Sequence, residues 1–372
     1  MFLKQLSLIN FKNHSEFEAK FSEKINCFVG NNGIGKTNLL DAIHYLSFCK
    51  SFFTAIDSQN IKHNEGFFVI QGFFDKVGEQ SEVYCGIKRN QKKIFKKNKK
   101  EYDRLSEHIG QFPLVMISPS DSDLINDSSE ARRKFLDGII SQYDKVYLDK
   151  LISYNQVLKQ RNALLKHFYE TRSFDSETLE IWDEQLVMYG RSILEIRIEF
   201  LKQFIPLFNS YYKFISESKE EVAIHYENSL GEKDYKTGLL TTLARDRAVN
   251  YTTVGPHKDD LDFKLNNFSL KKYASQGQQK SFLLALKLAQ FEFIKNQKNT
   301  KPLLLLDDVY DKLDEARFTK LLEMVSSDKF GQVFITDTHA DRMNELLNQK
   351  KIEHRIFMVD NNLINSLTEP SH

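Results

Sequence analysis

The hydrophobic pattern of the first 128 residues predicts mainly β-strands. Apolar residues alternate with polar ones through Phe17, Ala19 and Phe21, and the short apolar run Ile25–Val29 stops at Gly30. From Thr37 the apolar spacing changes to threes and fours, which predicts a helix. Further apolar runs predict strands at 67–74, 82–88, 93–95 and 113–117.

The middle of the chain has a different pattern, rich in Leu, Lys, Glu, Gln and Tyr and poor in Gly. Apolar residues recur there at intervals of three and four, which predicts helices at 129–143, 145–168, 175–202 and 203–218. Because a sustained heptad repeat is not evident, we expect a compact helical lobe and not a coiled-coil arm.

The final third returns to a mixture of strands and helices. Gln276–Phe293 is an apolar helix, and Leu303–Leu306 and 332–336 are buried strands. We therefore predict an α/β fold with mixed sheets, built from 1–128 and 220–372 as one discontinuous domain, with the all-helical lobe 129–219 inserted into it.

One segment has the spacing of a phosphate-binding loop. The sequence from Gly30 to Thr37 matches G-x-x-x-x-G-K-[ST], with a predicted strand before it and a helix after it. Glycines let backbone N–H groups approach phosphate oxygens, and the helix presents its positive N-terminal end to them. A chance glycine loop is the alternative. The residues that we expect to bind ATP here are Gly30, Asn31, Asn32, Gly33, Ile34, Gly35, Lys36, Thr37 and Asn38.

Within that loop, Lys36 supplies a positive charge to the outer phosphates, and the hydroxyl of Thr37 is a ligand for Mg²⁺. The strand Leu303–Leu306 ends in two carboxylates, at the edge where open α/β sheets bind ligands. We assign Asp307 to Mg²⁺ coordination. We assign Asp308 and Lys36 to catalysis, Asp308 by polarising the attacking water and Lys36 through its charge on the outer phosphates. A helix cap or a salt-bridged strand end is the alternative for this pair.

A third motif distinguishes between classes of phosphate-loop protein. Ser275 to Gln279, before an apolar helix, is similar to the signature motif of ABC-type ATPases, in which a serine, a glycine and a helix N-terminus contact a nucleotide held by another subunit. We expect Ser275, Gly277 and Gln278 to contact ATP, the alternative being a plain capped helix. Lys312–Asp314 resembles the D-loop of such ATPases. Asp337, Thr338 and His339 compete for the position that senses the γ-phosphate, and an exposed helix cap is the alternative for His339.

The net charge of +1 does not by itself indicate nucleic acid, but the charge is unevenly distributed. Nine basic residues lie between Lys88 and Arg104, opposed only by Glu101 and Asp103. Such a patch fits phosphate binding, and it equally fits a strand edge whose lysines prevent aggregation.

Localisation follows from what the sequence lacks. The three cysteines form no C-x-x-C pair, which fits a reducing compartment and argues against a zinc site. The sequence shows neither a signal peptide nor a long apolar stretch, so we expect a cytoplasmic protein without membrane partners.

Taken together, these motifs resemble the RecF family over the whole chain. The resemblance includes Asn10–Asn13, Arg132–Asp137, Tyr154–Asn162, Trp182–Asp183 and Gly255–Leu261. Family members usually carry Arg where this chain has Lys258 and Phe53. Because Lys holds phosphate less specifically than Arg, both positions are expected to bind phosphate more weakly here.

The resemblance implies a P-loop NTPase with an ABC/SMC-type head and a weak, DNA-stimulated ATPase that acts as a switch. It implies an ATP-dependent homodimer that binds duplex DNA and single-strand gap junctions, and that works with RecR and RecO type mediator proteins to load recombinase. Two alternatives stay open, another SMC/ABC-type chromosome-associated ATPase or a small-molecule P-loop kinase. A transporter subunit of the ABC type is a related alternative, and it would need a surface that contacts a membrane partner.

Overall fold

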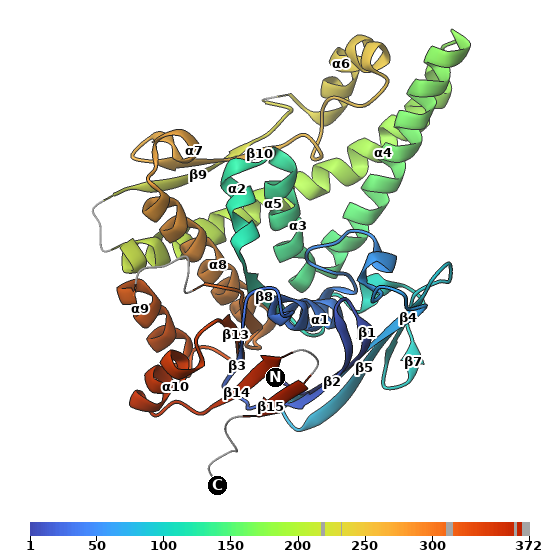
Figure 1. The fold of residues 1–372 in the computed structure, drawn as a ribbon. Coiled ribbons are helices and arrows are strands. Elements are labelled where there is room, and N and C mark those ends of the chain that lie inside the picture. The colour runs from blue at the N-terminus through green and yellow to red at the C-terminus, as the bar shows by residue number, and fades with distance from the viewer. Residues whose placement is uncertain (217–219, 232, 310–314, 361–362, 367–372) are drawn as a thin grey trace. The chain divides into compact units, whose positions relative to one another are not determined.

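The computed structural model describes residues 1–216, 220–231, 233–309, 315–360 and 363–366 (Figure 1). The chain divides into two compact units, one made of Met1–Asp121 with Lys287–His372 and the other of Ser122–Leu286. These units differ from the predicted domains in where they place residues 122–128 and 220–286. The predicted division into domains stays a prediction. Within the described residues, no helix is both long and apolar enough to cross a membrane.

The first unit contains an antiparallel sheet of six strands in the order β2-β1-β4-β5-β6-β7. Alternating burial along β1, β2 and β4 places one face of this sheet in the core. For β2, the alternation of Phe17 and Ala19 in the sequence predicts this. The strands are β1 Phe2–Phe11, β2 His14–Lys20, β4 Phe67–Lys76, β5 Glu79–Lys88, β6 Ile94–Lys97 and β7 Lys100–Glu101.

The second sheet of this unit has the order β15-β14-β3-β13-β12-β8 and is parallel except for β15. Its central strands are buried on both faces, which explains their continuous apolar sequences. The strands are β3 Ile25–Val29, β8 Leu114–Ile117, β12 Leu303–Leu306, β13 Val333–Asp337, β14 His354–Asp360 and β15 Leu363–Ser366. Because β3, β13 and β12 are neighbours, their carboxyl ends meet at one edge.

Helix α1, Lys36–Phe48, contacts strands of both sheets. Its buried residues Leu39, Ile43 and Leu46 join the core that the two sheets share. Phenylalanines fill the same core, as where the rings of Phe21 and Phe334 meet edge to face with centroids 4.9 Å apart. The other helices of this unit are α9 Glu315–Val325 and α10 Ala340–Gln349, and α8 Gln276–Lys298 begins in the second unit and ends in the first.

The second unit is mostly helical, and α4 and α5 pack side by side as a helical hairpin (Figure 1). The two helices predicted at 175–202 and 203–218 are a single helix, α5, in which Pro206 lies. Its buried face continues through Phe200, Phe204 and Phe208, and this packing outweighs the hydrogen bond that Pro206 removes. The helices are α2 Asp123–Asn126, α3 Ser129–Tyr143, α4 Lys145–Thr171, α5 Ser176–Ser216, α6 Tyr235–Val249 and α7 Leu270–Tyr273.

A small antiparallel sheet, with β9 Val222–Glu227, β10 Asp260–Leu265 and β11 Phe268–Ser269, completes this unit.

Buried arginines join the helices of the second unit. Arg161 of α4 donates to Asp183 of α5 at 2.5 Å and to Asp246 of α6 at 2.7 Å. Separating a buried ion pair leaves a buried charge without compensation, which is strongly destabilising. These contacts therefore fix the helices against one another.

Gly255 lies where a side chain has no room. Its φ of +123° is one that other residues rarely adopt, and a Cβ there would overlap the hydroxyl groups of Tyr235 and Tyr154. Those two hydroxyls hydrogen-bond to each other at 2.9 Å in the buried interior. Glycine at this position therefore lets the loop before β10 approach α4 and α6 closely.

We predict that Gly255→Ala lowers the free energy of unfolding by about 3 to 5 kcal/mol, since it adds both backbone strain and overpacking. Gly231→Ala is the matched control, because Gly231 also has a positive φ, +60°, but has open space around its Cβ position. That variant should lose only about 1 kcal/mol. Chemical denaturation measures the free energy of unfolding of both variants, and equal losses of stability would contradict the packing argument.

Candidate nucleotide site

The predicted phosphate loop connects the end of β3 to the start of α1. The backbone N–H of Gly30 donates to the carbonyl oxygen of Asp337 at 3.2 Å, which ties the loop to β13. The Lys36 ammonium donates to the carbonyl oxygens of Gly30 at 2.6 Å and Asn31 at 2.9 Å. Its charge therefore lies inside the curve of the loop, where the outer phosphates of a nucleotide would bind.

Asn13, in the turn between β1 and β2, supports the loop from behind. Its side-chain amide donates to the carbonyl oxygen of Ile34 at 2.7 Å and accepts from the amide of Asn38 at 2.7 Å. Gly35, with a φ of +109°, leaves the space that the Asn13 side chain fills. The sequence motif Asn10–Asn13 could have identified this residue, but its supporting role depends on a contact between distant segments.

The two predicted magnesium ligands lie together. The Thr37 hydroxyl donates to Oδ1 of Asp307 at 2.8 Å, and the Thr336 hydroxyl donates to the same atom at 2.9 Å. Burial raises the pKa of Asp307 to about 6, although the two hydroxyls and the nearby Lys36 act in the opposite direction. Thr336, at the end of the neighbouring strand, is a site residue that sequence reasoning did not identify.

Asp308 follows Asp307 in a left-handed backbone conformation, with a φ of +46°. Its backbone N–H donates to the Thr336 hydroxyl at 2.9 Å, so Thr336 holds both carboxylate-bearing residues. This bond fixes the backbone of Asp308 beside the loop while its side chain stays partly exposed. The position is compatible with the predicted role in orienting water, which stays a prediction.

Of the three candidates for the γ-phosphate sensor, Asp337 is already engaged. Its buried carboxylate accepts from Arg342 at 2.7 and 2.8 Å and from the backbone N–H of His339 at 2.8 Å. His339 instead has a side chain that is 65% exposed, and its Nδ1 hydrogen-bonds to the Thr338 hydroxyl at 2.8 Å. Thr338 and His339 are therefore the accessible candidates.

The signature segment in the second unit begins helix α8 with a capping box. The Ser275 hydroxyl accepts from the backbone N–H of Gln278 at 3.2 Å, and the Gln278 side chain accepts from the backbone N–H of Ser275 at 2.6 Å. Ser275 is exposed, and its hydroxyl proton has no acceptor among the described residues. The capped-helix alternative therefore describes the local geometry, and the predicted ATP contacts of Ser275, Gly277 and Gln278 stay predictions.

The predicted D-loop, Lys312–Asp314, lies outside the described residues.

The basic stretch contains two kinds of residue. Lys93 pairs with Asp57 at 2.6 Å, and Lys97 donates to Gln111 at 2.7 Å, so both serve the fold. The other seven basic side chains lie on or beside strands β5 to β7 and are exposed or partly exposed. We call this set the basic edge: Lys88, Arg89, Lys92, Lys96, Lys99, Lys100 and Arg104.

Comparison with known proteins shows the family of this chain. The sequence model of the family described as RecF/RecN/SMC N terminal domain matches residues 2–365. The DNA replication and repair protein RecF of Flavobacterium johnsoniae is 53% identical over 357 residues, covering 96% of this chain and 99% of the relative. The RecF of Phocaeicola vulgatus is 51% identical over 362 residues, 97% of each protein.

Solved structures extend the comparison to the fold. A structure of the recombination mediator protein RecF with ATP has a TM-score of 0.89 at 32% identity, covering 99% of this chain and 98% of that one. An Smc head domain from Pyrococcus furiosus has a TM-score of 0.57 at 16% identity, covering 99% of this chain and 96% of that one, which shows the fold alone. The predicted α/β fold of the ABC/SMC-head type is confirmed, and the chain belongs to the RecF family.

Proposed function

We propose that this protein binds DNA under the control of ATP and acts in DNA replication and recombinational repair. The observation that carries the proposal is the contact of Thr37 and Thr336 with the buried Asp307 carboxylate, directly behind the phosphate loop. The relatives named DNA replication and repair protein RecF, and the related structure with bound ATP, support it.

ATP binding follows from the loop and the helix behind it. Backbone N–H groups of residues 31–37 and the N-terminus of α1 face the phosphates, and Lys36 exchanges its carbonyl partners for phosphate oxygens. Asp308 orients the attacking water. The resulting ATPase is weak and stimulated by DNA, so hydrolysis serves to reset a binding state.

The residues around Asp307 fit Mg²⁺. The hydroxyl of Thr37 and the carboxylate of Asp307 are oxygen donors, which Mg²⁺ prefers. The raised pKa of Asp307 shows that burial disfavours its charge, and a bound cation would offset that cost. When bound, Mg²⁺ supplies charge neutralisation for the phosphates, and Thr37 and Asp307 are the residues that would hold it.

A second copy of the chain completes the site. The exposed Ser275 hydroxyl proton and the N-terminus of α8, with Gly277 and Gln278, are suited to contact a phosphate held by the other copy. ATP then stabilises the closed dimer more than the open form, and hydrolysis reopens it. The closed dimer binds duplex DNA and single-strand gap junctions in the cytoplasm, and it works with RecR and RecO type mediators in loading recombinase.

We predict that Lys36→Ala abolishes the ATP-dependent part of DNA binding, because the loop loses the charge that faces the outer phosphates. Fluorescence anisotropy of labelled duplex DNA, with and without ATP, measures the effect, and the ratio of the two affinities should fall to about one. Lys20→Ala, which removes an exposed lysine at the end of β2, is the control and should keep the wild-type ratio. An unchanged ratio in Lys36→Ala contradicts the proposal.

The basic edge gives a second prediction. Changing Lys99 and Lys100 together to Gln should reduce the slope of log affinity against log salt concentration by about 2, since each lost phosphate contact removes about 0.9. Lys93→Gln is the contrasting variant, because it removes the ion pair with Asp57 and should lower the melting temperature while keeping the slope. A wild-type slope in the Lys99 and Lys100 variant would show that the edge serves only solubility.

A further inference from the structure

A groove lies between helices α5 and α6 of the second unit. Beyond one end of it, Gly190 of α5 leaves room for the Tyr235 ring of α6, since a Cβ on Gly190 would lie 2.6 Å from that ring. At the other end, the guanidinium of Arg247 on α6 lies over the Phe174 ring, 4.0 Å from its centre. The two helices are therefore held to each other on both sides of the groove.

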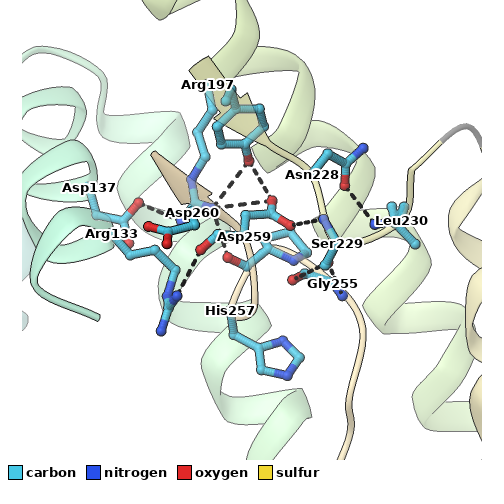
Figure 2. Close-up of polar contacts among 12 residues, drawn as sticks. Arg133, Asp137, Arg197, Asn228, Ser229, Leu230, Gly255, His257, Asp259 and Asp260 are labelled. Carbon is cyan, nitrogen blue, oxygen red and sulfur yellow. Dashed lines mark hydrogen bonds and ion pairs between the residues drawn. The ribbon is translucent and has the colours of Figure 1, made fainter. Parts of the chain in front are cut away.

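Contacts from neighbouring segments also fix the two helices. Buried Arg161 of α4 joins α5 and α6 through one carboxylate on each of them. The segment that leads into α6 is ordered as well (Figure 2): the Asp259 carboxylate accepts from the backbone N–H of Ser229 at 2.8 Å, and the Asn228 side chain accepts from the backbone N–H of Leu230 at 2.9 Å. The groove is therefore formed before a ligand enters it, which lowers the cost of binding.

The inner surface of the groove is mainly apolar. Leu179 of α5 and Leu239 of α6 are 2% and 1% exposed and form its floor, whereas Leu240 at the rim is 61% exposed. The apolar side chains that line the groove are Phe174, Leu179, Val187, Leu239, Leu240 and Leu243. A continuous apolar surface that is open to water is typical of a site that another apolar surface covers.

The wall that α5 contributes to the groove is acidic. Residues 174–190 contain five carboxylates and no Lys, Arg or His. Three of these carboxylates line the groove, and the one on Asp183 is already paired with Arg161. The other two, on Glu180 and Glu184, lie one helical turn apart on exposed positions. The groove therefore presents negative charge to water along one side of an apolar floor.

Charge, volume and length select the kind of ligand. The acidic wall repels phosphate, which disfavours DNA, and the cavity volume of about 270 Å³ lies below the roughly 300 to 1,000 Å³ of small-molecule sites. The groove follows α5 from Ser176 to Val187, about 16 Å or three turns of helix. Lys236 of α6 lies 4.0 Å from Glu180, and both are 61% exposed, so a ligand separates this pair at little cost. A groove of this length and composition fits one face of another helix.

We propose that the α5–α6 groove binds an amphipathic helix of a partner protein. Apolar side chains spaced by three and four along that helix enter the groove, and lysine or arginine side chains beside them pair with Glu180 and Glu184. The inference goes beyond the proposed nucleotide chemistry, because none of the lining residues belongs to the predicted ATP site.

The test selects a phage-displayed library of helical peptides against the immobilised full-length protein. Fluorescence anisotropy then measures the affinity of the selected peptides for the wild-type protein and three variants. Leu240→Asp places a charge at the rim of the apolar surface, and Glu184→Lys reverses a charge on the acidic wall. Ile181→Asp is the matched control, because Ile181 lies on α5 and is 56% exposed but does not line the groove. Thermal melting accompanies each variant, and if Leu240→Asp does not fold, Glu184→Lys carries the test.

We expect the selected peptides to share apolar residues at helical spacing with Lys or Arg beside them. Leu240→Asp should weaken their binding about tenfold or more, because an apolar contact is lost and a charge is buried in its place. Glu184→Lys should weaken binding about fivefold near 0.1 M salt and less near 1 M, since salt screens exposed charges. Ile181→Asp should keep the wild-type affinity.

Three results would overturn the proposal: a selection that yields no peptide binding the wild-type protein, selected peptides without the basic amphipathic pattern, or equal binding to Leu240→Asp, Glu184→Lys and wild type. A second copy of this chain is the rival occupant. In that case, sedimentation without ATP would show a wild-type dimer that Leu240→Asp, but not Ile181→Asp, converts into a monomer, and the partner helix would be refuted.

Discussion

The carboxylate of Asp307 is the group on which the candidate nucleotide site depends. It is buried at the end of β12 and accepts hydrogen bonds from Thr37 on α1 and Thr336 on β13. A buried carboxylate is stable only when its oxygens are well bonded, so the loop, the helix and two strands must keep their mutual positions. The same requirement keeps the Thr37 hydroxyl and the Asp307 carboxylate, the two oxygen donors proposed for Mg²⁺, next to the predicted phosphate loop.

The second unit uses charge differently. Arg161 and Arg197 are buried and paired with carboxylates, and they hold helices and a loop together. Arg133 instead donates to a backbone carbonyl oxygen, that of Asp259, and the negative charges of Asp260, Glu130 and Asp137 act on its guanidinium. Neighbouring guanidinium groups thus have different tasks, and the difference lies in their partners and not in their residue type.

Local patterns explain how much the sequence could predict. The phosphate loop and the strand before Asp307 are continuous in sequence, so spacing alone identified them, and α3 lies at the predicted 129–143. Asn13 and Thr336 act through contacts with residues far along the chain, which spacing cannot reveal. The single helix α5 was missed because the apolar face that carries it past Pro206 is stabilised by tertiary packing.

The central claim is that ATP is held between two copies of this chain, one contributing Lys36 and the other Ser275. Sedimentation mass of the wild-type protein and of Ser275→Arg, each with and without ATP, tests it most directly. The account predicts that ATP doubles the mass of the wild-type protein from 43.6 kDa, and that Ser275→Arg binds ATP normally yet stays a monomer. ATP-driven dimers of Ser275→Arg, as abundant as those of wild type, would contradict it.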